Sequence, residues 1–119
     1  MNGAALIRWG TARAGREATG LEVFGSAIAH FENMAKQGRL HGHREYISIT
    51  GRDGGFMMLE GEVAELTRII TEEETLKLNA QASAIVHDFE IQVYAGGTDQ
   101  SVSELTRTYA DSIQQLGYM

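Results

Sequence analysis

Four residues have side chains that could carry chemistry at one site: Arg8, Glu17, Tyr46 and Glu90. An arginine can bind an anionic group in a pocket, and a glutamate in a cleft can act as a general base. Each also has a structural interpretation, which we favour for Arg8 and Glu17. Arg8 would form a cross-strand ion pair, and a glutamate in the first turn of a helix interacts favourably with the helix dipole.

Metal chemistry has weaker support. His41 and His43 would share one face of an extended strand, with Glu45 as the only further ligand nearby, so solvated histidines are the favoured interpretation. The carboxylates of Glu72–Glu74 fan outwards on a helix and cannot converge on one ion. His87 could carry a proton, yet no serine or cysteine nucleophile accompanies it. We therefore predict neither a metal nor a cofactor.

The stretch TGRDGGF, residues 50 to 56, resembles a phosphate-binding glycine loop. Such a loop needs a helix directly after it and usually a lysine, and FMMLEG provides neither. Asp53, Gly54 and Gly55 instead suit the positive φ angles of a tight reversal. The sequence predicts a hairpin here.

The composition limits the class of protein. The 119 residues suit one domain, residues 1 to 119, and the absence of cysteine removes disulfides and thiolate chemistry. A net charge of -6 disfavours nucleic acid as a partner. No stretch resembles a signal peptide or a membrane span, so we expect a soluble, cytoplasmic protein.

The hydrophobic spacing predicts seven elements. Apolar positions at Leu21, Phe24, Ile28 and Phe31 indicate a helix from 16 to 37 that ends at Gly38, with Glu17 on the face turned towards the sheet. His30 falls off this stripe, at the surface. Apolar residues or strict alternation predict strands at 5–9, 42–50, 56–63 and 87–95. Helical spacing predicts a helix over 63–70, and a capping box of Thr71 with Glu74 predicts a break and a second helical start there. A second capping box, Ser101 with Glu104, predicts the start of a final helix that ends at Gly117.

With right-handed crossovers, this order gives a ferredoxin-like α+β domain. Its four-stranded antiparallel sheet has the order 4-1-3-2, with the crossover helices on one face and a C-terminal helix in addition. Trp9 should face the helices, in the core. Arg8 should lie between Glu90 and Glu60 on the bare face, which carries the following residues: Leu6, Arg8, Tyr46, Ser48, Thr50, Phe56, Met58, Glu60, Glu90, Gln92 and Tyr94.

The chain resembles the small proteins of the dimeric α+β barrel superfamily. The likeness rests on the element order and on GRE-x3-LEVF from Gly15, GR-L from Gly38 and GGFM from Gly54. It implies a homodimer formed through the bare sheet face. We expect a small organic ligand in a modest cavity, either at that face or between the sheet and the helices. Catalysis, where present, would be cofactor-light oxygenation or isomerisation. The asparagine, tryptophan and histidine set of haem-degrading relatives cannot be mapped onto this sequence.

A non-catalytic alternative remains open. In it, the mixed face serves only for dimerisation or for contact with another protein. A cavity lined by Arg8, Tyr46 and Glu90 would favour ligand binding, whereas a face filled by partner side chains would favour the interaction module.

Overall fold

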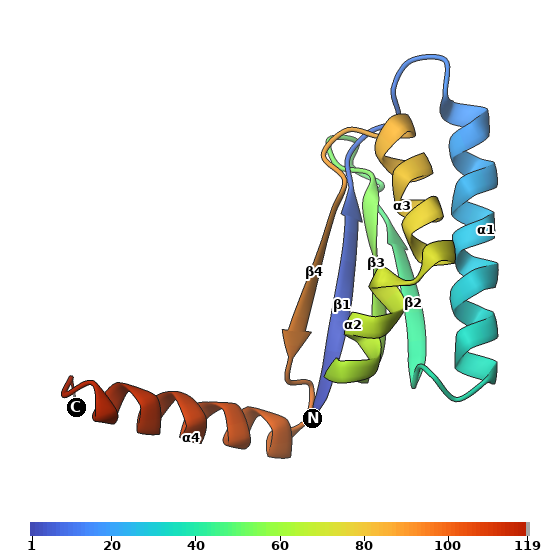
Figure 1. Cartoon of the computed structure of the whole chain (residues 1–119). Helices are drawn as coiled ribbons and strands as arrows, with labels where there is room; N and C mark the ends of the chain where they lie inside the picture. The colour runs from blue at the N-terminus through green and yellow to red at the C-terminus, as the bar shows by residue number, and fades with distance from the viewer. Residues whose placement is uncertain (119) are drawn as a thin grey trace.

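The computed structural model describes residues 1–118 and contains a four-stranded antiparallel sheet with helices on one side (Figure 1). The strands are β1 (Asn2–Trp9), β2 (Gly42–Ile47), β3 (Gly55–Glu62) and β4 (Glu90–Ala95). The helices are α1 (Glu17–Lys36), α2 (Val63–Thr71), α3 (Glu73–Ile85) and α4 (Asp99–Gln115).

The strand order is β2-β3-β1-β4, which is the predicted order read from the other edge. All three pairings are antiparallel. Because side chains alternate along a strand, each strand presents one set to the helices and one to the open face. In β1, Ala5 and Ile7 are buried under the helices while Arg8 is exposed on the other side.

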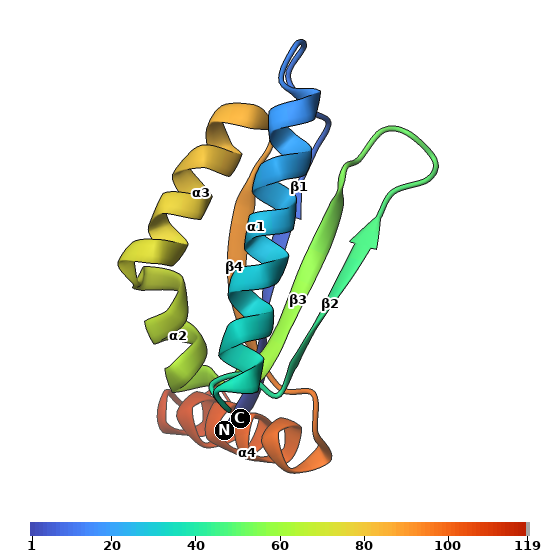
Figure 2. The same ribbon diagram turned by 90° about the vertical axis from the view of Figure 1, so that its right-hand side faces the viewer.

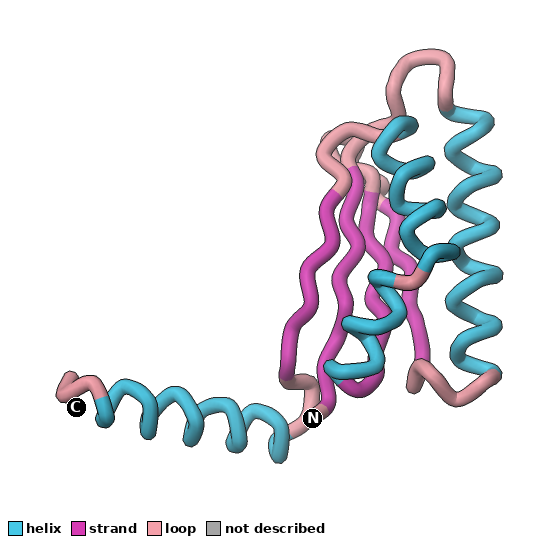
Figure 3. Tube along the Cα trace, viewed as in Figure 1, coloured by secondary structure: helices cyan, strands magenta, loops and turns pink. Residues whose placement is uncertain are grey.

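Helices α1, α2 and α3 form one layer over the inner face of the sheet, as Figures 2 and 3 show from two directions. The core between the two layers includes Leu59, Leu66, Ile69 and Phe31, all with 2% exposure or less. None of the helices within residues 1–118 combines the length and apolarity that a membrane crossing needs.

The hairpin prediction for residues 50 to 56 is confirmed, with a partly different use of its glycines. Gly51 and Gly55 have positive φ angles of 100° and 150°. Gly54 is needed for space: a Cβ there would lie 2.2 Å from Cδ1 of Trp9 and 2.1 Å from the carbonyl oxygen of Gly10. The loop therefore folds onto the indole, and any larger residue would collide with it.

Both predicted capping boxes are wrong, although the helices begin close to the expected positions. Helix α3 starts after Glu72, and the hydroxyl of Thr71 instead donates back into α2. Helix α4 is capped by Thr98, which accepts a hydrogen bond from the backbone N–H of Ser101. The Ser101 hydroxyl is buried and accepts from the backbone N–H of Asn2, so tertiary contact decided which residue caps the helix.

Candidate ligand-binding pocket

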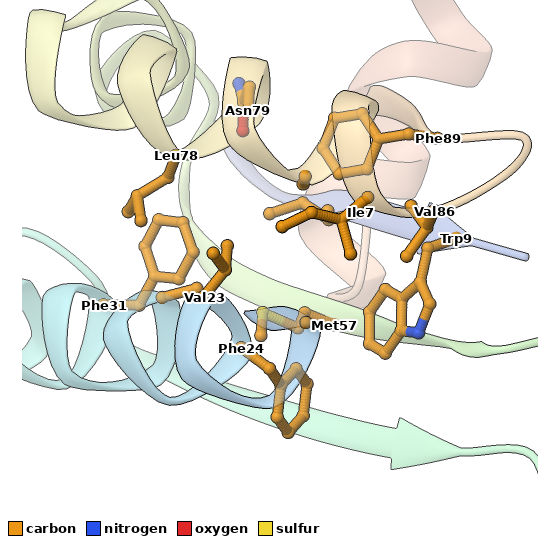
Figure 4. Close-up of a pocket in the computed structure, with 14 residues that line it drawn as sticks. Ile7, Trp9, Val23, Phe24, Phe31, Met57, Leu78, Asn79, Val86 and Phe89 are labelled. Carbon is orange, nitrogen blue, oxygen red and sulfur yellow. The ribbon is translucent and has the colours of Figure 1, made fainter. Parts of the chain in front are cut away.

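An apolar cavity of about 80 Å³ lies between the sheet and helices α1 and α3 (Figure 4). The sheet contributes its floor, the two helices its walls, and the α3–β4 connection one end. Its lining residues are Ile7, Trp9, Gly20, Val23, Phe24, Ala27, Phe31, Met57, Leu78, Asn79, Ala82, Ile85, Val86 and Phe89.

Small residues on the facing helices leave this space. Gly20 and Ala27 of α1 and Ala82 of α3 all line it, where a core usually places larger side chains. Near Gly20 the two helices come close, since a Cβ at that position would lie 3.2 Å from Cγ2 of Ile85. The two helices therefore touch at this end of the cavity.

Trp9 is the most distinctive side chain of the lining. It stands at the end of β1 and makes an edge-on contact with Phe24, with ring centroids 5.5 Å apart. Its predicted position facing the helices is confirmed, since it packs against the core cluster and is partly exposed. Phe24 and Phe89 extend the aromatic lining, so the pocket suits an apolar ring.

Asn79 supplies the one side-chain amide, and the Trp9 indole N–H is the other polar group among the described lining side chains. The lining includes no side chain that ionises near neutral pH. Such a site favours an apolar molecule that carries one hydrogen-bonding group, because the amide can both donate and accept.

Two arginines hold α3 over the cavity. Arg39, which follows α1, donates to Glu65 of α2 at 2.8 Å and to Glu72 at the α2–α3 break. These hydrogen bonds raise the pKa of Arg39 and lower the pKa of Glu72, while the pKa of Glu65 is lowered first by its hydrogen bond from Arg68 and then by the one from Arg39. At the other end of α3, Arg16 donates to the carbonyl oxygen of Ala84, where the negative end of the helix dipole favours a cation.

The predicted site residues Arg8, Tyr46 and Glu90 lie on the open face, away from this cavity. Glu90 is directly opposite Arg8 across the β1–β4 pairing, as predicted. The ionic partner of Arg8 is Asp53 of the hairpin loop, however, at 3.6 Å.

The predicted position of Glu60 beside Arg8 is wrong, because Phe56 holds that place in the register. Glu60 lies opposite Ala4 and pairs with Arg44 at 3.5 Å. Alternation along a strand does not set the register between strands, and the expected neighbour Glu60 lies four residues along β3 from the real neighbour Phe56. Tyr46 stacks on Phe56 with centroids 4.9 Å apart.

Glu17 is exposed, so the prediction that it faces the sheet and not the solvent is wrong, whereas its place in the first turn of α1 agrees with the favoured interpretation, an overhanging glutamate near the helix dipole. It lies seven residues before Phe24 and so falls near the buried azimuth, but it occupies the first turn of α1. Leu21 in the next turn is 75% exposed as well, so this side of the first two turns of α1 lies in solvent. Helical periodicity predicts the direction of the Glu17 side chain, but it does not predict whether another element covers that turn of α1.

The histidines occupy separate sites. His43 of β2 hydrogen-bonds to Glu32 of α1 and to Glu45. The contact with Glu32, and after it the contact with Glu45, raises the pKa of His43, and His43 lowers the pKa of Glu32. His41 and His87 are exposed. No group of three or more potential metal ligands is found among the described residues.

His30, expected at the surface, is partly buried instead. Its Nε2 lies 3.0 Å from the hydroxyl of the fully buried Thr75. This contact joins α1 to α3 on the side away from Trp9, so the prediction failed because α3 covers a part of α1 that its own apolar stripe does not mark.

Comparison with known structures supports the fold. A conserved protein from Methanosarcina mazei Go1 matches with a TM-score of 0.62 and 14% identity, over 79% of this chain and 92% of its own. A variant of SnoaB, a cofactor-independent oxygenase from Streptomyces nogalater, matches with a TM-score of 0.62 and 13% identity, over 81% of this chain and 94% of its own. An antibiotic biosynthesis monooxygenase matches with a TM-score of 0.57 and 13% identity, over 82% of this chain and 100% of its own.

At 13% to 14% identity these neighbours show the fold alone, and at that level the ferredoxin-like α+β fold expected from the sequence is confirmed. The chain is a ferredoxin-like α+β protein with an apolar cavity under its helix layer. No family model and no curated protein matches the sequence.

Proposed function

We propose that this protein binds a small, mainly apolar ring compound with one hydroxyl or carbonyl group in the cavity beneath α1 and α3. The observation that carries the proposal is the lining itself: aromatic and aliphatic side chains with Asn79 as the one amide. Polar groups set the orientation of ligands in such pockets, while apolar contacts supply most of the affinity.

The size of the cavity limits the ligand. Its volume of about 80 Å³ is well below the roughly 300 Å³ at which pockets for drug-sized ligands begin. A single substituted ring is therefore the largest ligand we propose, and it would enter with some outward movement of side chains. The neighbouring fold includes a cofactor-independent oxygenase and a monooxygenase, which supports oxygenation as the reaction to test.

The binding test uses Trp9, the one tryptophan of the sequence, as an internal reporter. Phenol and toluene are titrated while Trp9 fluorescence and the thermal midpoint of unfolding are recorded. We expect saturable changes with both compounds and tighter binding of phenol. Failure of both compounds to alter either signal up to their solubility limits would refute the proposal.

The role of Asn79 is tested by Asn79→Leu. Loss of one neutral hydrogen bond costs about 1 kcal/mol, so phenol should bind about fivefold more weakly while toluene binding is unchanged. The matched control is Asn33→Leu, which changes an exposed asparagine on α1 outside the cavity. Equal weakening of both compounds would assign Asn79 to packing and not to recognition. Oxygen uptake in the presence of bound phenol then tests for conversion.

A second proposal concerns the open face. Leu6, Phe56 and Met58 are only partly buried there, and Tyr46 and Tyr94 remain 48% and 49% exposed. We propose that a second copy of the chain covers this face as a homodimer, and that Arg8, Tyr46 and Glu90 line the space between the copies. Light scattering at micromolar concentration tests the dimer. Exposed Glu17 stays a candidate base at the rim of α1, to be tested by Glu17→Gln in any activity assay.

A further inference from the structure

Helix α4 stands away from the rest of the molecule. It leaves the end of β4 and runs out on the side of the sheet opposite α1, α2 and α3, as the two views of Figures 1 and 2 show. The radius of gyration is 16.8 Å, larger than the roughly 13.5 Å expected for a compact chain of this length. Apart from its first turn, α4 touches little of its own chain.

One side of α4 carries an uncharged, apolar stripe. Steps of three and four place these residues on one face: Val102, Leu105, Tyr109, Ile113 and Leu116. Four of them are exposed, from 41% at Ile113 to 71% at Leu116, and Leu105 is half-buried. Glu104, Arg107 and Asp111 lie on the other side of the helix. A helix with this pattern normally buries its stripe against another surface.

The stripe begins beside the sheet. A Cβ on Gly96, directly after β4, would lie 3.8 Å from Cγ2 of Val102. The Ser101 hydroxyl accepts from the backbone N–H of Asn2 at the start of β1, which fixes the direction in which α4 leaves. The open sheet face and α4 thus form the two sides of one corner.

The open sheet face and the α4 stripe each provide a substantial part of the contact area. The four strands are six or eight residues long and about 4.8 Å apart, which gives the sheet face a flat footprint of about 450 Å². The 17 residues of α4 span about 26 Å, and a stripe about 10 Å wide adds about 260 Å². Adding the stripe of α4 to the sheet face enlarges the area available for contact by more than half. This brings it closer to the roughly 800 Å² that each partner buries in a stable interface.

The shared fold of the structural neighbours accounts for less than the whole chain. They cover 79% to 82% of it while most of their own length is matched. About a fifth of this chain thus has no counterpart in them, which is close to the length of α4 with the residues after it.

We infer that α4 is an arm that packs against a second copy of this chain. The second copy fills the corner between this arm and the open sheet face. The inference rests on the proposed homodimer. A second copy is the occupant because a two-fold axis brings two identical corners together, so both sheet faces and both stripes are covered at once. The arm then holds its partner beyond the edge of the sheet.

The test compares two matched charge substitutions, Ile113→Asp in the stripe and Thr108→Asp on the polar side. Both add one negative charge at exposed positions of the same helix. Light scattering across a dilution series gives the dissociation constant of the dimer. We expect Ile113→Asp to weaken the dimer at least tenfold and Thr108→Asp to leave it within twofold of the original protein.

A second measurement uses the absence of cysteine in the sequence. Tyr109→Cys and Thr108→Cys each introduce one thiol, and Tyr109 is 65% exposed in the single chain. At concentrations where the dimer forms, the thiol at 109 should react with a maleimide at least tenfold more slowly than the thiol at 108. The two rates should become equal on dilution.

Three results would overturn the inference. A dimer in which both thiols react at the same rate would leave the sheet-face dimer standing and remove the arm. A protein that is monomeric at micromolar concentration would remove both. A tetramer that Ile113→Asp converts into a dimer would show that the stripes pair between dimers and not within one.

Discussion

Filling the cavity tests whether the space under α3 is a binding site. Ala82→Leu places three extra carbons on the wall that α3 contributes. Sealed cavities destabilise a protein by about 24 cal/mol per Å³, so about 1.9 kcal/mol is the upper limit of what filling this partly open cavity of about 80 Å³ can add to the free energy of unfolding. We expect a gain of roughly 1 to 2 kcal/mol, because imperfect fit offsets part of it.

The measurement is urea unfolding followed by Trp9 fluorescence, together with the phenol titration. The same substitution at Ala80, which is exposed on the opposite side of α3, is the matched control. Ala82→Leu should stabilise the fold and abolish phenol binding, whereas Ala80→Leu should change stability by less than about 0.5 kcal/mol and leave binding intact.

The opposite pattern would refute the reasoning. If Ala82→Leu destabilised the protein by more than about 1 kcal/mol, the space would be too small or too rigid to accept the side chain. If it stabilised the protein while phenol still bound with the original affinity, the ligand site would lie elsewhere.

Three further predictions concern the elements around the cavity. Gly54→Ala should destabilise the fold by about 1 to 3 kcal/mol and shift the emission of Trp9, because the new Cβ would overlap the indole. For His43, whose pKa is raised in the fold, the stabilising contribution is complete below its unfolded pKa of about 6.5 and is lost as the pH rises through the folded pKa; unfolding titrations of His43→Gln should lack that decline. Arg39→Met should lower the thermal midpoint, and high salt should lower that of the original protein towards the variant's value, since the ion pairs it loses are screened by salt.

The strand faces and the strand order followed from the sequence because they depend on local periodicity and on the handedness of crossovers. Alternation along β4 placed Glu90 and Tyr94 on the open face, where the structure has them. The end of α1 at Gly38 was equally local, since Gly38 has a φ angle of 77°.

A cavity between the sheet and the helices was one of two expected positions, but its lining and volume could not be predicted in this way. Both depend on how far α1 and α3 stand apart, which is set by the contact of Gly20 with Ile85 and by His30 with Thr75. The place of Asn79 in the cavity lining was not predicted for the same reason, because the sequence around it does not distinguish it from the other polar residues of α3. The small residues Ala27 and Ala82 on the helices were the one available signal.

The two arginines at the ends of α3 determine how the cavity can change volume. Arg39 pairs with Glu72 at the start of α3 and Arg16 donates to Ala84 at its end, so opening the helix at either end breaks one of these contacts. The cavity can expand while both contacts are kept if the central turns of α3, around Leu78 and Ala82, bow outwards. A ligand larger than the cavity therefore has to push the middle of α3 outwards, and the strain in the helix rises with each added atom.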